Sequence, residues 1–274
     1  MPGDNFIVGH WNNELQVFQQ NLVSLQQKIN AEAIHDLRVA VKKLRCYAKL
    51  CTILFKTTDS KKLLTNTEEL FSVLGRHRNI EVCKELLPSF FKKDEPVSIQ
   101  VLRYLQLLQE QVSQYCKSAL DKYERTPLNE LTRQIEQNFK DKEEQEIFIL
   151  MLPVLKSSIK NIKQYLKDFK NRSHRIRKSL KDVFYWSKAC PVELVFTKAQ
   201  LKTIDKILDH LGSIQDHEVL RTNLKIFRKT ILTGDIPEYD MIKKTEMKAE
   251  RKKNNLLQKA HRMTEELIKQ VYKK

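Results

Sequence analysis

The sequence predicts an all-α protein on the strength of two observations. Only 5 Gly and 7 Pro occur among 274 residues, and so few interruptions favour long helices over a turn-rich sheet protein. Apolar side chains also recur at helical spacing, as between residues 33 and 45, where Ile34, Leu37, Val41 and Leu44 share one face. A hydrophobic content of 41% is enough to build the core of one large domain.

The apolar periodicity divides the chain into ten expected helices. They span about 5–30, 32–56, 60–76, 78–90, 97–124, 144–170, 173–189, 197–211, 215–231 and 240–271. Gly75 and Gly212 are interpreted as C-terminal stops, each followed by a new helix in which Asn79 or Asp216 serves as a cap or first-turn residue. The last helix, about 240–271, is amphipathic and is expected to dock on the core.

A stripe of cations follows one face of the expected helix at 32–56. At 100° per residue, offsets 0, 3, 7, 10 and 14 fall within an arc of roughly 80°. The residues at these offsets are His35, Arg38, Lys42, Arg45 and Lys49, and no acid follows Asp36 until Asp59. Apolar residues border the stripe on both edges, unlike the mixed charges of an ordinary wet face. Mutual repulsion predicts an anionic partner, and the alternative is neutralisation by acids from other helices.

The stripe is repeated later in the chain, together with its surroundings. His174, Arg177, Lys181 and Lys188 reproduce offsets 0, 3, 7 and 14, with Phe184 at offset 10. The segment LGRHRNIEV places its glycine forty residues after the first histidine, and LGSIQDHEV places its glycine thirty-eight residues after the second. One supersecondary unit used twice, with half-repeats at about 5–125 and 143–235, would bring both stripes to a shared space about a pseudo-twofold axis.

The net charge of +16 is concentrated on these repeated segments. Residues 37–56 carry 6 basic side chains and no acid, and residues 160–190 carry 10 basic and 2 acidic ones. Residues 94–150, by contrast, carry 7 basic and 11 acidic side chains. Such a field attracts polyanions, whether nucleic acid, an anionic membrane or phosphate chains, and does not choose among them.

These motifs resemble the conserved histidine α-helical domain (CHAD) family over nearly the whole chain, from about residue 10 to 270. The resemblance rests on His35, Arg38, the segment 42–45 and the LG and RN pairs at 74–75 and 78–79, and on the second copy at His174, Arg177, Lys181, Leu211, Gly212 and Asp216. It implies a single domain over 1–274, made of two pseudo-twofold-related four-helix units around a basic central pore, plus the C-terminal helix. Members of the family bind inorganic polyphosphate, and some associate with polyphosphate granules.

The residues expected to contact polyphosphate are those of the two stripes. They are His35, Arg38, Lys42, Arg45, Lys49, His174, Arg177, Lys181 and Lys188, with Lys43, Arg78 and Lys178 as additional candidates. This sequence departs from the family pattern in three places. Asn79 replaces an aspartate, Gln215 takes an arginine position, and Phe184 interrupts the second stripe. The first two changes are expected to alter a helix start or an ion pair, and the third to weaken one side of the pore.

Binding without catalysis is expected, with no cofactor. The chain has no GxxxxGK loop, no GxSxG elbow, no paired-carboxylate strand and no ExExK strand of the triphosphate tunnel hydrolases that some family members carry. Its seven histidines include no HxxxH or HxxE pair, so no metal site is expected. For His35 and His174 two interpretations remain, a core histidine bonded to a neighbouring helix or a phosphate donor charged when the anion is bound.

Sequence features also predict where the protein is located and which polyanion it binds. The longest apolar run, at 147–155, is too short to span a membrane, and the segment MPGDNFIVGH lacks the pattern of a secretory signal. Five cysteines without a CxxC pair favour a reducing compartment, so we expect a cytoplasmic protein, with polyphosphate granules as a candidate destination and no membrane partner. Because single-strand binders interleave aromatic residues with cations and the first stripe has none, phosphate chains are favoured, and RNA or DNA binding is the alternative.

Overall fold

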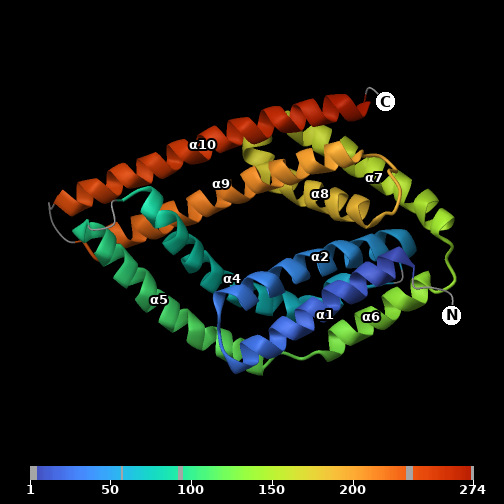
Figure 1. The fold of residues 1–274 in the computed structure, drawn as a ribbon, viewed down its shortest axis with the longest axis horizontal. Helices are drawn as coiled ribbons and strands as arrows, with labels where there is room; N and C mark the ends of the chain where they lie inside the picture. The colour runs from blue at the N-terminus through green and yellow to red at the C-terminus, as the bar shows by residue number, and fades with distance from the viewer. Residues whose placement is uncertain (1–4, 57, 92–94, 233–236, 273–274) are drawn as a thin grey trace.

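The computed structural model describes residues 5–56, 58–91, 95–232 and 237–272, and every regular element in these ranges is helical (Figure 1). The all-α prediction is therefore confirmed. The helices are α1 (Phe6–Gln27), α2 (Ala31–Phe55), α3 (Ser60–Leu63), α4 (Thr65–Leu86), η1 (Leu87–Ser89), α5 (Pro96–Asp121), α6 (Thr126–Phe139), α7 (Glu144–Leu166), α8 (Phe169–Ala189), α9 (Lys198–Thr230) and α10 (Pro237–Tyr272).

The prediction that Gly75 and Gly212 end helices is wrong. Helix α4 runs from Thr65 to Leu86 and α9 from Lys198 to Thr230, so each glycine lies in a helix interior. Asn79 and Asp216 are accordingly mid-helix residues and not caps. A glycine in a helix interior costs roughly 0.5–1 kcal/mol relative to alanine, so another contact must account for its presence there.

Helix α6 was not expected from the sequence. Its apolar residues recur at helical spacing and are buried, and they are Leu128, Leu131, Ile135 and Phe139. The helical spacing of these four residues is the signal that predicts α6. Helix α6 packs beside α1 and α2, on the side of the molecule opposite α9 and α10 (Figure 1).

Four helices form a closed ring of contacts at the centre of the molecule. Helix α2 packs against α4, α4 against α9, α9 against α8, and α8 against α2. Each member also carries an outer helix, which is α1 on α2, α5 on α4, α7 on α8 and α10 on α9. The set α1, α2, α4 and α5 thus has the same contact pattern as the set α7, α8, α9 and α10. The symmetry axis relating the two sets stays a prediction.

The buried apolar residues form two separate cores. In α4, Leu74 belongs to the larger core and Ile80 to the smaller one; in α9 the same change occurs between Leu211 and Leu220. The first interval covers most of the repeated segment LGRHRNIEV, and the second contains LGSIQDHEV. Polar and charged residues therefore form a layer between the two cores. Cations without a carboxylate partner cannot be buried among apolar side chains without a large cost in free energy.

Candidate functional site

The two cation stripes meet where the four central helices come together. Arg38 and Lys42 of α2 lie near Arg177 and Lys181 of α8, close enough that the charge on each side lowers a pKa on the other. We call these four residues the central cluster. All four are half-buried, and among the ion pairs of the described residues none involves them.

Burial and mutual repulsion shift the pKa values of the central cluster. Burial first, and then the charges of Lys181, Arg38 and Arg177, together lower the pKa of Lys42 to about 7 against the opposing effect of Asp216. Burial, followed by the Arg177 charge, lowers the pKa of Lys181 to about 8. Burial likewise lowers the pKa of Arg38 to about 10. Keeping these four side chains protonated in the folded protein therefore costs free energy, and a bound anion would offset that cost.

Each of the two glycines lies beside an arginine, but only Gly75 is needed to make room for one. A Cβ atom added at Gly75 would lie 2.6 Å from Nη1 of Arg38, and one added at Gly212 would lie 3.5 Å from Nη2 of Arg177. The Arg38 guanidinium also donates to the Phe71 carbonyl oxygen and lies 3.9 Å from the centre of the Phe71 ring. The Leu-Gly pair of the first repeat thus marks a close approach that requires a residue without a Cβ, whereas at Gly212 a Cβ would meet Arg177 at an ordinary contact distance.

The arginine of the second stripe is held less completely than that of the first. Nη1 of Arg177 donates to Oε1 of Gln215 at 2.6 Å, whereas its Nε is buried and has no hydrogen-bond partner among the residues that the structure describes. Asp216, the residue after Gln215 on α9, supplies a carboxylate near the cluster, and burial raises its pKa while Arg177 and Arg78 lower it. The cluster therefore has one neighbouring acid, which the sequence interpretation missed because Asp216 looked like a cap.

The outer part of the first stripe is neutralised by acids from other helices. Nε of Arg45 lies 2.7 Å from Oε1 of Glu68 on α4, and Lys49 pairs with Asp182 on α8. Here the alternative interpretation is correct for two of five cations, and neither Glu68 nor Asp182 carries a sequence signal that would identify it. Tertiary contacts alone bring these acids to the stripe.

The remaining predicted residues lie around the cluster or away from it. His35 and His174 are exposed at its edge, and burial is the main cause that lowers the pKa of each below 6.5. Arg78 pairs with Glu85 at 2.8 Å but still acts on the pKa of Arg38. The other three are separated from the cluster: Lys43 pairs with Glu14 of α1 at 2.6 Å, and Lys178 and Lys188 are exposed on α8.

Two of the three departures from the family pattern can now be located. Phe184 is buried in the larger core and lies 5.6 Å from the Lys188 ammonium, so it adds packing where the first stripe has Arg45. Gln215 binds Arg177 as a neutral acceptor, which replaces the expected change at a helix start with a hydrogen bond between α8 and α9. Asn79 is exposed on α4, and nothing in the structure explains its identity.

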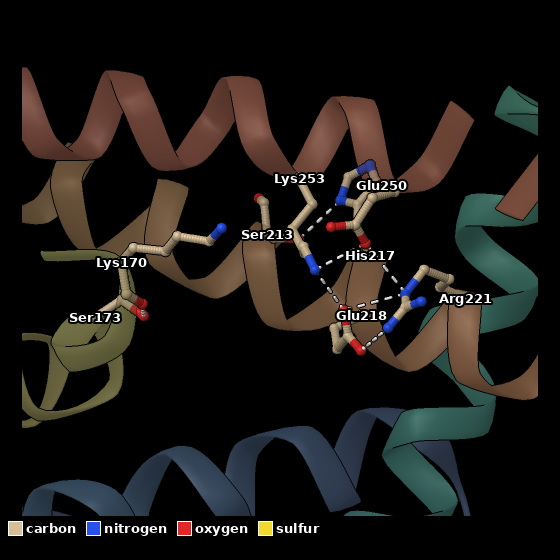
Figure 2. Close-up of polar contacts among 8 residues, drawn as sticks. All are labelled: Lys170, Ser173, Ser213, His217, Glu218, Arg221, Glu250 and Lys253. Carbon is tan, nitrogen blue, oxygen red and sulfur yellow. Dashed lines mark hydrogen bonds and ion pairs between the residues drawn. The ribbon is translucent and has the colours of Figure 1, made fainter. Parts of the chain in front are cut away.

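A second charged group lies on α9 and α10, and it is internally neutral. Glu218 accepts from Arg221 at 2.5 Å and from Lys253 at 2.8 Å, while Glu250 lies 3.2 Å from Arg221 and 2.8 Å from Lys253 (Figure 2). We call these four residues the α9–α10 network. Its hydrogen bonds, from Arg221 first, lower the pKa of Glu218 to about 2 against the effect of burial.

Two further observations concern metal sites and membrane-spanning helices. Within the described ranges, no group of three or more His, Cys, Asp or Glu side chains is placed to hold a metal ion. In the same part of the chain, no helix combines the length and apolar content needed to cross a bilayer.

Comparisons with known proteins agree with this architecture. A family model described as CHAD domain matches residues 10–225. The crystal structure of the CHAD domain from the plant Ricinus communis is similar with a TM-score of 0.69 and 19% sequence identity, covering 90% of this chain and 84% of that chain. A comparison with curated proteins gives no match. At 19% identity, the likeness to the plant structure is one of fold.

Proposed function

This chain belongs to the CHAD domain family, and we propose that it binds inorganic polyphosphate through the central cluster without catalysing a reaction on it. One observation carries the proposal. Arg38, Lys42, Arg177 and Lys181 are half-buried together without an ion-pair partner in the described part of the chain, and burial lowers the pKa of each. Only an anion that enters between the helices would satisfy all four at once.

A bare phosphate chain fits this chemistry better than a nucleic acid. Polyphosphate has no bases, so its binding site needs dense positive charge and donors but no stacking surfaces. Phe71, the aromatic ring beside Arg38, is covered by that guanidinium and does not offer a free face on that side. RNA or DNA binding through the same cations is the alternative that the experiment below separates.

We infer binding alone because the sequence has none of the phosphate-transfer or hydrolase motifs sought above. A domain of this kind would recruit the protein to polyphosphate, and polyphosphate granules in the cytoplasm are the destination that we propose. His35 and His174 would act as donors at the edges of the site, where a bound anion would favour their charged forms.

A competition titration tests the proposal. Long-chain polyphosphate and single-stranded RNA of equal charge would compete for the full chain near physiological salt, with polyphosphate expected to bind at least tenfold tighter, about 1.4 kcal/mol. Affinity should fall steeply as salt rises, because counterions are released from the polyanion on binding. Equal affinities for the two polyanions would favour a nonspecific basic surface instead.

Thermal melts test whether one ligand bridges both stripes. Orthophosphate, tripolyphosphate and long chains at equal total phosphate should stabilise the protein in that increasing order, because only a chain can reach Arg38 and Arg177 together. The variant Lys42→Gln/Lys181→Gln should lose most of the shift given by long chains. Identical shifts for the three ligands would contradict bridging.

A further inference from the structure

A groove of about 360 Å³ lies beside the central cluster, between α8, α9 and α10. Its wall on α8 carries Lys170, Ser173, His174 and Arg177, and its floor and far wall come from α9 and α10. The volume is within the range of small-molecule sites, about 300–1,000 Å³. Figure 2 shows the Lys170 side chain extending from α8 toward α9 and α10.

The groove joins two surfaces of different chemistry. Its apolar part consists of Leu211 and Ile214 on α9 and Leu257 on α10. Its cationic part leads to the central cluster, because Arg177 lines the groove and belongs to the cluster. An inorganic phosphate chain has no use for an apolar floor, whereas an organic phosphate can bury its body there while its phosphates reach the cations.

The charges of the groove favour an anion despite two acids in its lining. Glu218 and Glu250 are held by Arg221 and Lys253, so they do not repel a ligand as free carboxylates would. On the α8 wall, by contrast, Lys170 forms no ion pair with any described residue, and Nε of Arg177 is a buried donor without a partner. That unused donor points to a missing acceptor in the bound state.

The amide side chains at the rim of the groove favour one class of non-phosphate group in an organic phosphate ligand. Asn254 offers a donor and an acceptor to the groove, and Gln215, whose Oε1 accepts from Arg177, offers its amide N–H groups as donors. A flat heterocycle presents matching ring nitrogens and exocyclic groups at its edge, while its faces suit the apolar floor. We propose that this groove binds a nucleoside polyphosphate, with its base over Leu211, Ile214 and Leu257 and its phosphate chain directed toward Lys170 and Arg177.

The test compares adenosine triphosphate, guanosine triphosphate and inorganic tripolyphosphate by calorimetry on the full chain, without divalent cations. The better nucleotide should bind at least tenfold tighter than tripolyphosphate, because only it has a base and sugar to place in the groove. Long polyphosphate should displace the nucleotide, since both use Arg177. Equal affinity for nucleotides and tripolyphosphate would overturn the proposal.

Variants on α10 locate the site. Leu257→Gln should reduce nucleotide affinity to the level of tripolyphosphate and leave tripolyphosphate affinity unchanged. Leu256→Gln is the matched control, since Leu256 is a partly buried leucine of the same helix that does not line the groove. Asn254→Ala, at an exposed position, should weaken nucleotide binding severalfold without a change in melting temperature. If the control weakens nucleotide binding as much as Leu257→Gln, the proposed site is wrong.

These results are distinguishable from those on the central cluster. Leu257→Gln should leave the affinity for long polyphosphate unchanged, whereas Lys42→Gln/Lys181→Gln should lower it strongly. A chain that binds polyphosphate but treats nucleotide and tripolyphosphate alike would retain the proposed function and lose the groove site. The reverse result would keep the groove site and remove the proposed function.

Discussion

The central cluster and the α9–α10 network contain similar cations in opposite electrostatic states. Burial lowers the pKa of Lys42 to about 7. In the network, burial has the same direction of effect on Lys253, but hydrogen bonds to Glu218 and Glu250 outweigh it and raise the pKa. Both lysines lie on helices of the same domain. The difference is whether the protein itself supplies the carboxylates.

A cation that already has its acid is part of the structure, and one that lacks it is available to a ligand. Arg221 and Lys253 share two glutamates, so replacing either cation should chiefly affect stability. Lys42 and Lys181 have no such partner among the described residues, so replacing them should chiefly affect binding. Sequence composition cannot make this distinction, because both groups count equally toward the net charge of +16.

The largest expected effect is on polyphosphate affinity. The double variant Lys42→Glu/Lys181→Glu should weaken binding of long chains at least a hundredfold, about 2.7 kcal/mol, because it places two acids where phosphate must lie. The control Lys202→Glu/Lys206→Glu makes the same change in net charge at exposed positions on α9 and should cost less than threefold. Equal losses in fluorescence-anisotropy titrations would show that only net charge matters.

The second effect is a pH dependence of binding. The unliganded pKa values of Lys42 and Lys181 are lowered to about 7 and about 8, and a bound polyanion would raise both. Binding is therefore strongest below these values and weakens as pH rises through them, since protons must then be taken up. Between pH 6.5 and 9 we expect a loss of at least tenfold.

Calorimetry in buffers of different ionisation enthalpy counts the protons taken up at pH 8. The variant Lys42→Arg/Lys181→Arg is the control, because guanidinium groups keep their charge over this range. Its affinity should change much less with pH than that of the unaltered chain. A pH profile shared by both proteins would assign the dependence to other groups, His35 and His174 first.

The third effect is on stability, and its sign should differ between the two groups. Glu218→Gln leaves Arg221 and Lys253 with one shared acid, which should lower stability by about 1 kcal/mol and the melting temperature by about 2–4 °C. Because the folded pKa of Glu218 is lowered from 4.5 to about 2, its contribution is present above pH 4.5 and is lost as pH falls toward 2.

Lys42→Met should instead raise the melting temperature of the unliganded chain by a few degrees at pH 6. The folded pKa of Lys42 is about 7, well below its unfolded value of 10.5, so the unfolded state binds more protons between these values. The cost of charging the folded side chain is complete below pH 7 and disappears as pH rises toward 10.5. The gain should therefore shrink at pH 10, and a variant that destabilises at pH 6 would mean that Lys42 is a structural partner.

The smallest effect separates the two glycines. Gly212→Ala should be neutral or stabilise by up to about 1 kcal/mol, since the added Cβ meets Arg177 at an ordinary 3.5 Å and alanine favours the helix. Gly75→Ala should gain less or lose stability, because Arg38 must move away from a contact of 2.6 Å. It should also weaken polyphosphate binding, and the matched Gly212 variant measured by the same melts and titrations serves as its control.

The sequence indicated which helical segments repeat, but it did not indicate which acids neutralise the cations. Helical spacing identified both stripes, and their repeated context indicated that they face each other, as Lys42 and Lys181 do. Gly75 was misread because a helix end and a close approach by an arginine both favour a residue without a Cβ, and Gly212 was misread by analogy although its contact with Arg177 would allow a Cβ. The pairing of Arg45 with Glu68 and of Lys49 with Asp182 could not be predicted, since it depends on how separate helices pack.

The groove beside the central cluster could not be predicted from the sequence either. Its floor comes from α9, while its walls come from α8 and α10, and no single segment contains its pattern. Helix α10 was expected to dock on the core, and it does so along α9, but only the structure places Leu257 opposite Lys170 and Arg177.

Lys42 should also differ from other lysines in its chemical reactivity. Because its pKa is lowered to about 7, a far larger fraction of its ε-amino groups is unprotonated and nucleophilic at pH 7.5 than for lysines near 10.5, which are almost entirely protonated. A small amine-reactive ester should therefore acylate Lys42 ahead of the exposed lysines. A polyanion that protonates and covers the amine would protect it, so the mass of one labelled peptide would report how much of the protein is occupied.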